Sequence, residues 1–124
     1  MKVGQWVRYE NVISRFVGFC DCGFCQERGF LEPIFEGCYH YFHNEKEWLK
    51  AKQKCIVANT PQELIQVGDL VVTRALNVLP VIKIHNDVEL LKSYEDTFRF
   101  DVITEISTLT DKDTYKCQWR KSNE

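Results

Sequence analysis

Two short stretches of the chain gather side chains that could hold a metal ion. They are CDCGFC at residues 20–25 and CYHYFH at residues 38–43. Their candidate ligands are Cys20, Cys22, Cys25, Cys38, His40 and His43. Structural zinc takes four thiolate or imidazole ligands in a tetrahedron, and Cys-x2-Cys turns commonly supply two of them. The two stretches therefore predict a structural zinc site.

The spacing suggests which side chains would ligate. Cys22 and Cys25 form the Cys-x2-Cys pair, and Gly23 eases the turn between them. Twelve residues separate this pair from the second stretch, a length that suits a finger-sized loop. Two of Cys38, His40 and His43 would then complete the site, and the thiol of Cys20 could replace one of the four ligands.

A second interpretation treats the same side chains as ordinary parts of a fold. Cys20, Cys22 and Cys38 would then be small core residues, with His40 and His43 half exposed. Gln26 supports this interpretation, because most zinc knuckles have glycine directly after the second cysteine.

The sequence gives less support to other functional roles for the cysteines, such as redox chemistry. A thioredoxin-like pair needs a helix N-terminus after a buried strand in a βαβ unit, and the sequence around Cys22 and Cys25 does not indicate one. Cys55 and Cys117 stand alone in apolar strand patterns, which predicts two core thiols.

The sequence predicts that most of the elements that position these residues are short strands. Alternating apolar and polar residues predict strands at 3–9, 11–19, 38–43, 70–76, 81–85, 98–106 and 115–119, with an edge strand around Pro33. Asn44 and Glu47 predict the start of a short helix, with a charged strand as the alternative for this stretch. Thr60, Pro61 and Glu63 predict a further capped turn of helix. Residues 77–80 are expected to form a turn.

This order of elements predicts a mostly β fold with short helices, built as one or two small SH3-like barrels. The 124 residues fit a single compact domain, residues 1–124. Residues 3–19 and 67–85 share a plan of Val-Gly, strand, turn and strand, so residues 1–58 and 59–124 could be similar half-barrels.

Composition narrows the function classes. Sixteen basic and eighteen acidic residues give a net charge of −2, which does not favour nucleic-acid binding. We expect no membrane span and no signal peptide, and hence a cytoplasmic protein whose six cysteines are metal ligands or free thiols. No phosphate-binding loop, carboxylate pair or serine elbow stands out, so no enzymatic activity is expected.

Aromatic side chains gather in the N-terminal half of the sequence. Eleven of the sixteen fall within the first 48 positions. Exposed rings among Phe24, Phe30 and Trp48 would form a partner-binding patch.

Four stretches also carry a resemblance: VGQWVRY, CDCGFCQERGFLEP, TPQELIQVGDLV and ITEISTLTDKDTYK. They resemble, in the same order, small uncharacterised proteins encoded by phages and prophages of low-GC Gram-positive bacteria. The resemblance covers most of the chain. It implies a phage or mobile-element origin and carries no activity with it.

Three functions follow as hypotheses. The first is a phage accessory protein that binds a host protein, for example a CRISPR nuclease or another antiviral component. The second is an oligomeric barrel that sequesters a small nucleotide signal, with its phosphate on Arg8, Arg15, Arg74 or Arg99. The third is a single-stranded nucleic-acid binding module.

Overall fold

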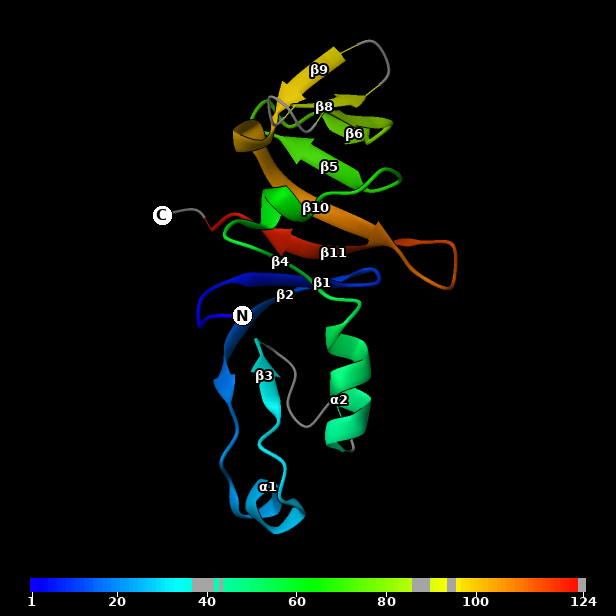
Figure 1. The fold of residues 1–124 in the computed structure, drawn as a ribbon. Helices are drawn as coiled ribbons and strands as arrows, with labels where there is room; N and C mark the ends of the chain where they lie inside the picture. Colours follow the sequence, from blue (N-terminus) through cyan, green and yellow to red (C-terminus); the bar gives the residue numbers. More distant parts are fainter. Residues whose placement is uncertain (37–41, 43, 86–89, 94–95, 123–124) are drawn as a thin grey trace. The chain divides into compact units, whose positions relative to one another are not determined.

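The computed structural model describes residues 1–36, 42, 44–85, 90–93 and 96–122. The chain divides into two compact units, Met1–Asn59 and Thr60–Glu124, called unit 1 and unit 2 below. Short antiparallel strands make up most of the regular structure, and the helices are short (Figure 1). The predicted class, mostly β with short helices, is therefore confirmed.

Unit 1 contains a four-stranded antiparallel sheet in the order β3-β2-β1-β4. Its elements are β1 (Trp6–Tyr9), β2 (Val12–Phe19), α1 (Gly23–Arg28), β3 (Pro33–Phe35), α2 (Glu45–Lys52) and β4 (Ile56–Ala58). Pro33 lies on an edge strand, as predicted, where its missing N–H costs no ladder bond. The pairing of β2 with β3 shifts register between Phe16 and Gly18, and Gly18 there adopts a positive φ of 134°.

The helix expected after Asn44 is present as α2. The Asn44 side chain accepts a hydrogen bond from the backbone N–H of Glu47 at 2.8 Å, which caps the first turn. Trp48 and Ala51, three residues apart, face inward. By contrast, α1 falls where the sequence indicated only a turn.

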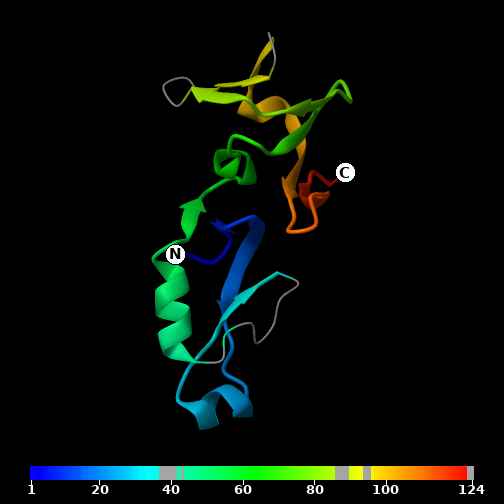
Figure 2. The same ribbon diagram turned by 90° about the vertical axis from the view of Figure 1, so that its right-hand side faces the viewer.

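The core of unit 1 joins the sheet to α2. Phe30, Phe42, Trp48 and Ala51 form a buried cluster, and Phe35 packs against it. Phe35 of β3 packs against Trp48 of α2, with their ring centroids 6.1 Å apart. α1 connects the end of β2 to β3 and lies at the end of unit 1 away from β1 (Figure 2).

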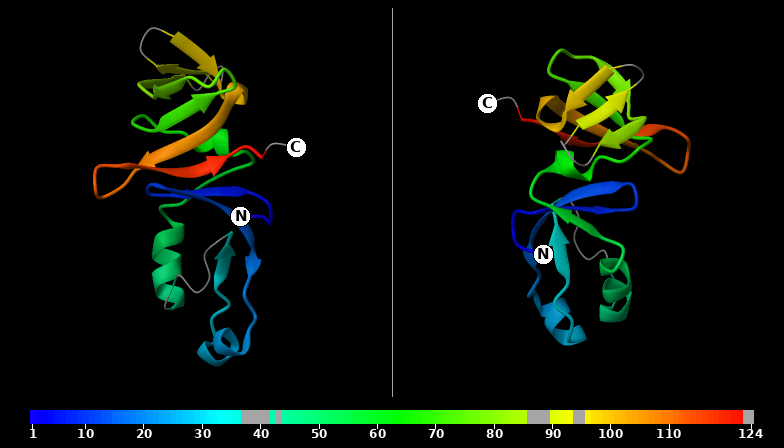
Figure 3. Two further views of the ribbon diagram at one scale, coloured as in Figure 1. Left: turned by 180° about the vertical axis from the view of Figure 1, so that it is seen from behind. Right: turned by 45° about the horizontal axis from the view of Figure 1, so that its top comes forward.

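Unit 2 contains one four-stranded sheet in the order β11-β10-β5-β6 and one three-stranded sheet in the order β7-β8-β9. Its elements are η1 (Pro61–Leu64), β5 (Leu70–Thr73), β6 (Val78–Pro80), β7 (Lys83–His85), β8 (Leu90–Ser93), β9 (Asp96–Arg99), η2 (Phe100–Val102), β10 (Ile103–Leu109) and β11 (Tyr115–Arg120). The predicted capped turn is η1, where the Glu63 carboxylate accepts the N–H of Thr60 at 3.1 Å. β10 and β11 form an antiparallel hairpin, and the turn that joins them projects from its end (Figure 3).

Two expectations for unit 2 are wrong. Residues 78–80 are strand β6, paired with β5, rather than part of a turn. The long strand expected from Phe98 to Ile106 is broken by η2, which lies between β9 and β10. The buried residues of β10 are Ile103, Ile106 and Thr108, so the strand does not continue an unbroken alternating series from Phe98.

The predicted barrel is not confirmed. Among the strands that the structure describes, none of the three sheets closes on itself. Similarity between the two halves also stays a prediction. Within the described part of the chain, no helix is long and apolar enough to cross a membrane.

The cross-strand pair of Glu105 and Arg120 gives a pH-dependent prediction. Arg120 donates to the Glu105 carboxylate at 2.8 Å and lowers its pKa. A carboxylate with a lowered pKa adds stability above its unfolded pKa, and this is lost as the pH falls through its folded pKa. Glu105→Gln should therefore lower the free energy of unfolding at pH 7 by at most about 1 kcal/mol. In urea titrations this difference should shrink as the pH falls from 7 and vanish at an acid pH where Glu105 is protonated in the folded state as well.

Asp101→Asn is the matched control, because Asp101 and Arg99 are both well exposed and lie 3.7 Å apart. It should change the unfolding free energy by less than Glu105→Gln at pH 7. An effect of Glu105→Gln that is equal at both pH values would contradict the electrostatic explanation.

Candidate metal site

The start of α1 brings three thiols together. The sulfur atoms of Cys20, Cys22 and Cys25 all lie within 4.8 Å of one another. Cys20 directly follows β2, Cys22 is the extended residue before α1, and Cys25 lies within the first turn of that helix. Cys25 is fully buried, whereas Cys20 and Cys22 are partly exposed. The cluster therefore lies at the border between core and solvent.

This arrangement fits a thiophilic metal ion. In tetrahedral zinc–thiolate sites, a Zn–S bond of about 2.3 Å places the sulfur atoms about 3.8 Å apart. Sulfurs that already lie within 4.8 Å need only small movements to reach that separation. Thiolates select soft or borderline ions such as zinc over magnesium or calcium. The three cysteines can thus supply three ligands of one metal site.

Hydrogen bonds within the cluster shift the pKa values of Cys20 and Cys22 in opposite directions. The backbone N–H of Cys25 lowers the pKa of Cys22, and the Cys20 side chain lowers it further. For Cys20, the backbone N–H of Cys22 acts to lower the pKa, but the Cys22 side chain, burial and Cys25 raise it overall. Cys22 is therefore deprotonated more readily than Cys20.

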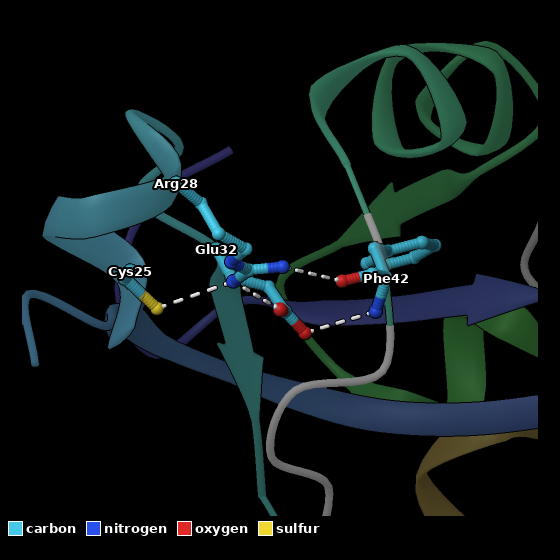
Figure 4. A network of polar contacts seen from close by, with 4 residues as sticks. All are labelled: Cys25, Arg28, Glu32 and Phe42. Carbon is cyan, nitrogen blue, oxygen red and sulfur yellow. Dashed lines mark hydrogen bonds and ion pairs between the residues drawn. The ribbon is translucent and has the colours of Figure 1, made fainter. Parts of the chain in front are cut away.

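A buried ion pair lies directly behind Cys25 (Figure 4). Nη2 of Arg28 donates to the Cys25 sulfur at 3.3 Å and to Oε1 of Glu32 at 2.9 Å. Nη1 of Arg28 donates to the backbone carbonyl of Phe42 at 3.1 Å, and the Phe42 N–H donates to Oε2 of Glu32 at 2.9 Å. Arg28 and Glu32 therefore hold both backbone groups of Phe42 next to α1.

The surroundings of this pair explain why both charges are tolerated. Glu32 has no exposed surface, and a buried carboxylate is stable only when hydrogen bonds and an opposite charge replace water. Arg28 also lies over two aromatic rings, with its guanidinium carbon 4.4 Å from the Phe24 centroid and 5.2 Å from the Phe30 centroid. The pair is thus matched in charge and enclosed by rings.

The structure brings together part of the predicted ligand set. Cys22 and Cys25 lie close together as expected, and the sulfur of Cys20 lies beside them, where it could replace one of the ligands from the second stretch. Cys38, His40 and His43 lie outside the described residues. Their ligand role stays a prediction.

The surroundings of Cys22 and Cys25 differ from the sequence prediction in one respect. The structure places Cys22 and Cys25 at the start of a helix that follows a strand, a setting that the sequence did not indicate. The remainder of a thioredoxin-like site is not present there, because β2 and β3 pair antiparallel instead of flanking the helix in a parallel βαβ unit.

The two isolated cysteines, Cys55 and Cys117, were both expected to be core thiols. Cys55 packs against the core, whereas Cys117 is exposed.

The three aromatic residues predicted to bind a partner differ in their exposure to solvent. Phe24 is 55% exposed, but Phe30 and Trp48 are 7% and 5% exposed and belong to the core cluster. Phe30 and Trp48 are therefore not exposed members of such a patch, and a partner contact through Phe24 stays a prediction.

Arg8, one of the arginines suggested for phosphate, is also buried, at 2% exposure. Its Nε donates to the backbone carbonyl of Glu10 at 2.9 Å. Its guanidinium therefore serves the interior of unit 1 rather than a ligand.

The Arg28–Glu32 pair was not recognised in the sequence. Gly29 ends α1 in a left-handed conformation, with φ of 69°, so the four-residue spacing of the pair is not helical. One signal was available: Glu32 is a lone charge in the apolar stretch FLEPIF. A charge in such a stretch indicates a buried and paired carboxylate.

No protein-family model matches the chain, and neither a curated protein nor a solved structure matches it. Its function is therefore inferred from the residues of unit 1.

Glu32 provides a stability prediction. Glu32→Gln should lower the free energy of unfolding by about 3 kcal/mol, because it leaves the Arg28 charge without its anion in a buried site. Urea unfolding followed by circular dichroism measures this difference. Glu27→Gln, on the exposed side of α1, is the control and should change it by less than about 0.5 kcal/mol. Equal effects of the two substitutions would show that the ion pair does not stabilise unit 1.

Proposed function

We propose that this chain is a non-enzymatic binding protein whose first unit holds a structural zinc ion through Cys20, Cys22 and Cys25. The observation that carries the proposal is the mutual distance of the three sulfur atoms, within 4.8 Å. The sequence predicts two ligands from Cys38, His40 and His43; in this proposal Cys20 replaces one of the two, and one of these residues is the fourth ligand.

The size of unit 1 supports a structural role for the metal. Domains of about 60 residues bury little apolar surface and are often stabilised by metals or disulfides. A helix of six residues, such as α1, is not stable by itself in water. Ligation by residues before and within α1 would fix this helix to the end of β2 and so close the part of unit 1 farthest from β1.

The partner proposed is a host protein, and specifically an antiviral component such as a CRISPR nuclease. The resemblance to phage proteins suggests this target, and the exposed ring of Phe24 next to the metal site offers a contact residue. None of the cysteines that the structure describes forms a disulfide, which suits the reducing bacterial cytoplasm. The SH3-like barrel belongs to the same proposal, because unit 1 and unit 2 each contain a sheet of four short antiparallel strands of their own.

The metal is tested first by native mass spectrometry of tag-free protein purified without chelator. Wild type should carry one zinc ion and lose it in acid. Cys20→Ser and Cys25→Ser should each lose most of the zinc, while Cys117→Ser, an exposed cysteine of unit 2, should retain it. A bare wild-type mass, or full zinc loading of both ligand variants, would contradict the site.

The partner is tested by affinity capture from a Gram-positive host that carries defined antiviral systems. Wild type should enrich a component of one such system, and Phe24→Ala should reduce its recovery about tenfold or more, as expected for an aromatic contact residue. Leu76→Ala removes a side chain that is 80% exposed in unit 2 and serves as the control. Capture of no antiviral component, or equal recovery by Phe24→Ala, would contradict this partner assignment.

A further inference from the structure

Arg28 contacts both the cysteine cluster and the core of unit 1. Its Nη2 atom donates to the sulfur of Cys25, and its two terminal nitrogens also contact Glu32 and the carbonyl of Phe42. Such a residue can sense whether the Cys25 sulfur is bound to a metal and can transmit that state to the core.

We propose that Arg28 is the outer hydrogen-bond partner of the metal site. In this role it stabilises the metal-bound thiolate of Cys25 and, with Glu32, links metal binding to the packing of Phe42 against Trp48. The inference rests on the zinc site proposed above and adds to it a residue that sets the metal affinity.

The charge of the site explains why a cation is needed. Three thiolates and one divalent ion carry a net charge of −1. A guanidinium 3.3 Å from one of the sulfurs offsets that charge and donates a hydrogen bond to the ligand. Outer hydrogen-bond partners of this kind orient metal ligands, and their loss commonly weakens metal binding by about 10- to 100-fold.

The shape of the side chain explains why it is arginine. The two terminal nitrogens of the planar guanidinium reach different acceptors: one contacts Cys25 and Glu32, and the other contacts Phe42. A lysine has one nitrogen on a flexible stem and cannot hold these three acceptors in the same geometry. Lysine should therefore preserve the charge but lose the link to Phe42.

The link from Arg28 to the core is continuous. Glu32 accepts the Phe42 N–H at 2.9 Å, and Arg28 donates to the Phe42 carbonyl at 3.1 Å, so the backbone of Phe42 is fixed on both sides. The Phe42 ring lies 5.1 Å from the ring of Trp48, which is buried. A shift of Arg28 when Cys25 ligates a metal must therefore alter the contacts of Phe42 with Trp48.

The first measurement is metal affinity. Cobalt(II) is titrated into apoprotein, its thiolate charge-transfer band is recorded, and zinc affinity is obtained by competition. Arg28→Gln should weaken zinc binding by about 10- to 100-fold, and Arg28→Lys should recover part of the loss. Arg15→Gln, which removes an exposed cation of unit 1, should leave the affinity within about twofold of wild type.

The second measurement is ¹⁹F NMR of protein that contains 5-fluorotryptophan. Zinc should shift the Trp48 resonance of wild type, leave that of Trp119 in unit 2 in place, and produce a smaller Trp48 shift in Arg28→Lys. The lysine variant retains the charge and keeps the test valid where the glutamine variant does not fold.

The outcomes separate the two proposals. If wild type binds zinc and the affinity of Arg28→Gln matches that of Arg15→Gln, the role of Arg28 is overturned while the zinc site stands. An unchanged Trp48 resonance on zinc binding overturns the link to the core. If wild type binds neither cobalt nor zinc, the proposed function itself fails.

Discussion

A carboxylate with no exposed surface lies between α1 and β3 of unit 1, and the surrounding residues satisfy its charge and hydrogen bonds. Glu32 loses its hydration in the fold, so it needs both a cation and hydrogen-bond donors. Arg28 supplies the cation and the backbone of Phe42 supplies a donor. These contacts hold the end of α1, the residue before β3 and the core cluster in one arrangement. The position of Cys25 follows from it, because Arg28 also donates to that sulfur.

The cysteine cluster and the ion pair stabilise the same region in complementary ways. The ion pair fixes the end of α1 to the core, whereas a metal on the three thiols would fix its beginning to the end of β2. α1 is only six residues long and Cys25 is its one buried residue, so it contributes little to the apolar core. In a unit of this size, polar and metal-mediated contacts replace part of the hydrophobic core that larger domains have.

Local sequence signals predicted the elements that depend on local chemistry. Asn44 with Glu47 marked the start of α2, the Thr60–Glu63 box marked η1, and Pro33 marked an edge strand, because capping and proline geometry act within a few residues. Features that depend on contacts between distant residues could not be predicted from local sequence signals. α1 spans six residues, too few for a helical pattern to be recognised. Trp48 stands among charged residues, yet it is buried by packing against Phe42 and Phe35.

For the same reason, only part of the candidate metal site could be predicted from the sequence. Cysteine spacing indicated metal chemistry around Cys22 and Cys25, because a Cys-x2-Cys pair is a local pattern. The place of Cys20 in the cluster depends on how β2 enters α1, and the contact between Arg28 and Cys25 depends on the burial of Glu32. Both are properties of the folded unit. The sequence could therefore indicate the type of site but not its full set of residues.

X-ray absorption spectroscopy at the zinc edge of the purified protein tests the central claim most directly, because it counts sulfur ligands. Zinc held by Cys20, Cys22 and Cys25 should show at least three sulfur neighbours at about 2.3 Å, with one further ligand completing the tetrahedron. Two or fewer sulfur neighbours, or a shell of nitrogen and oxygen alone, would contradict the assignment of these three thiols to one metal site.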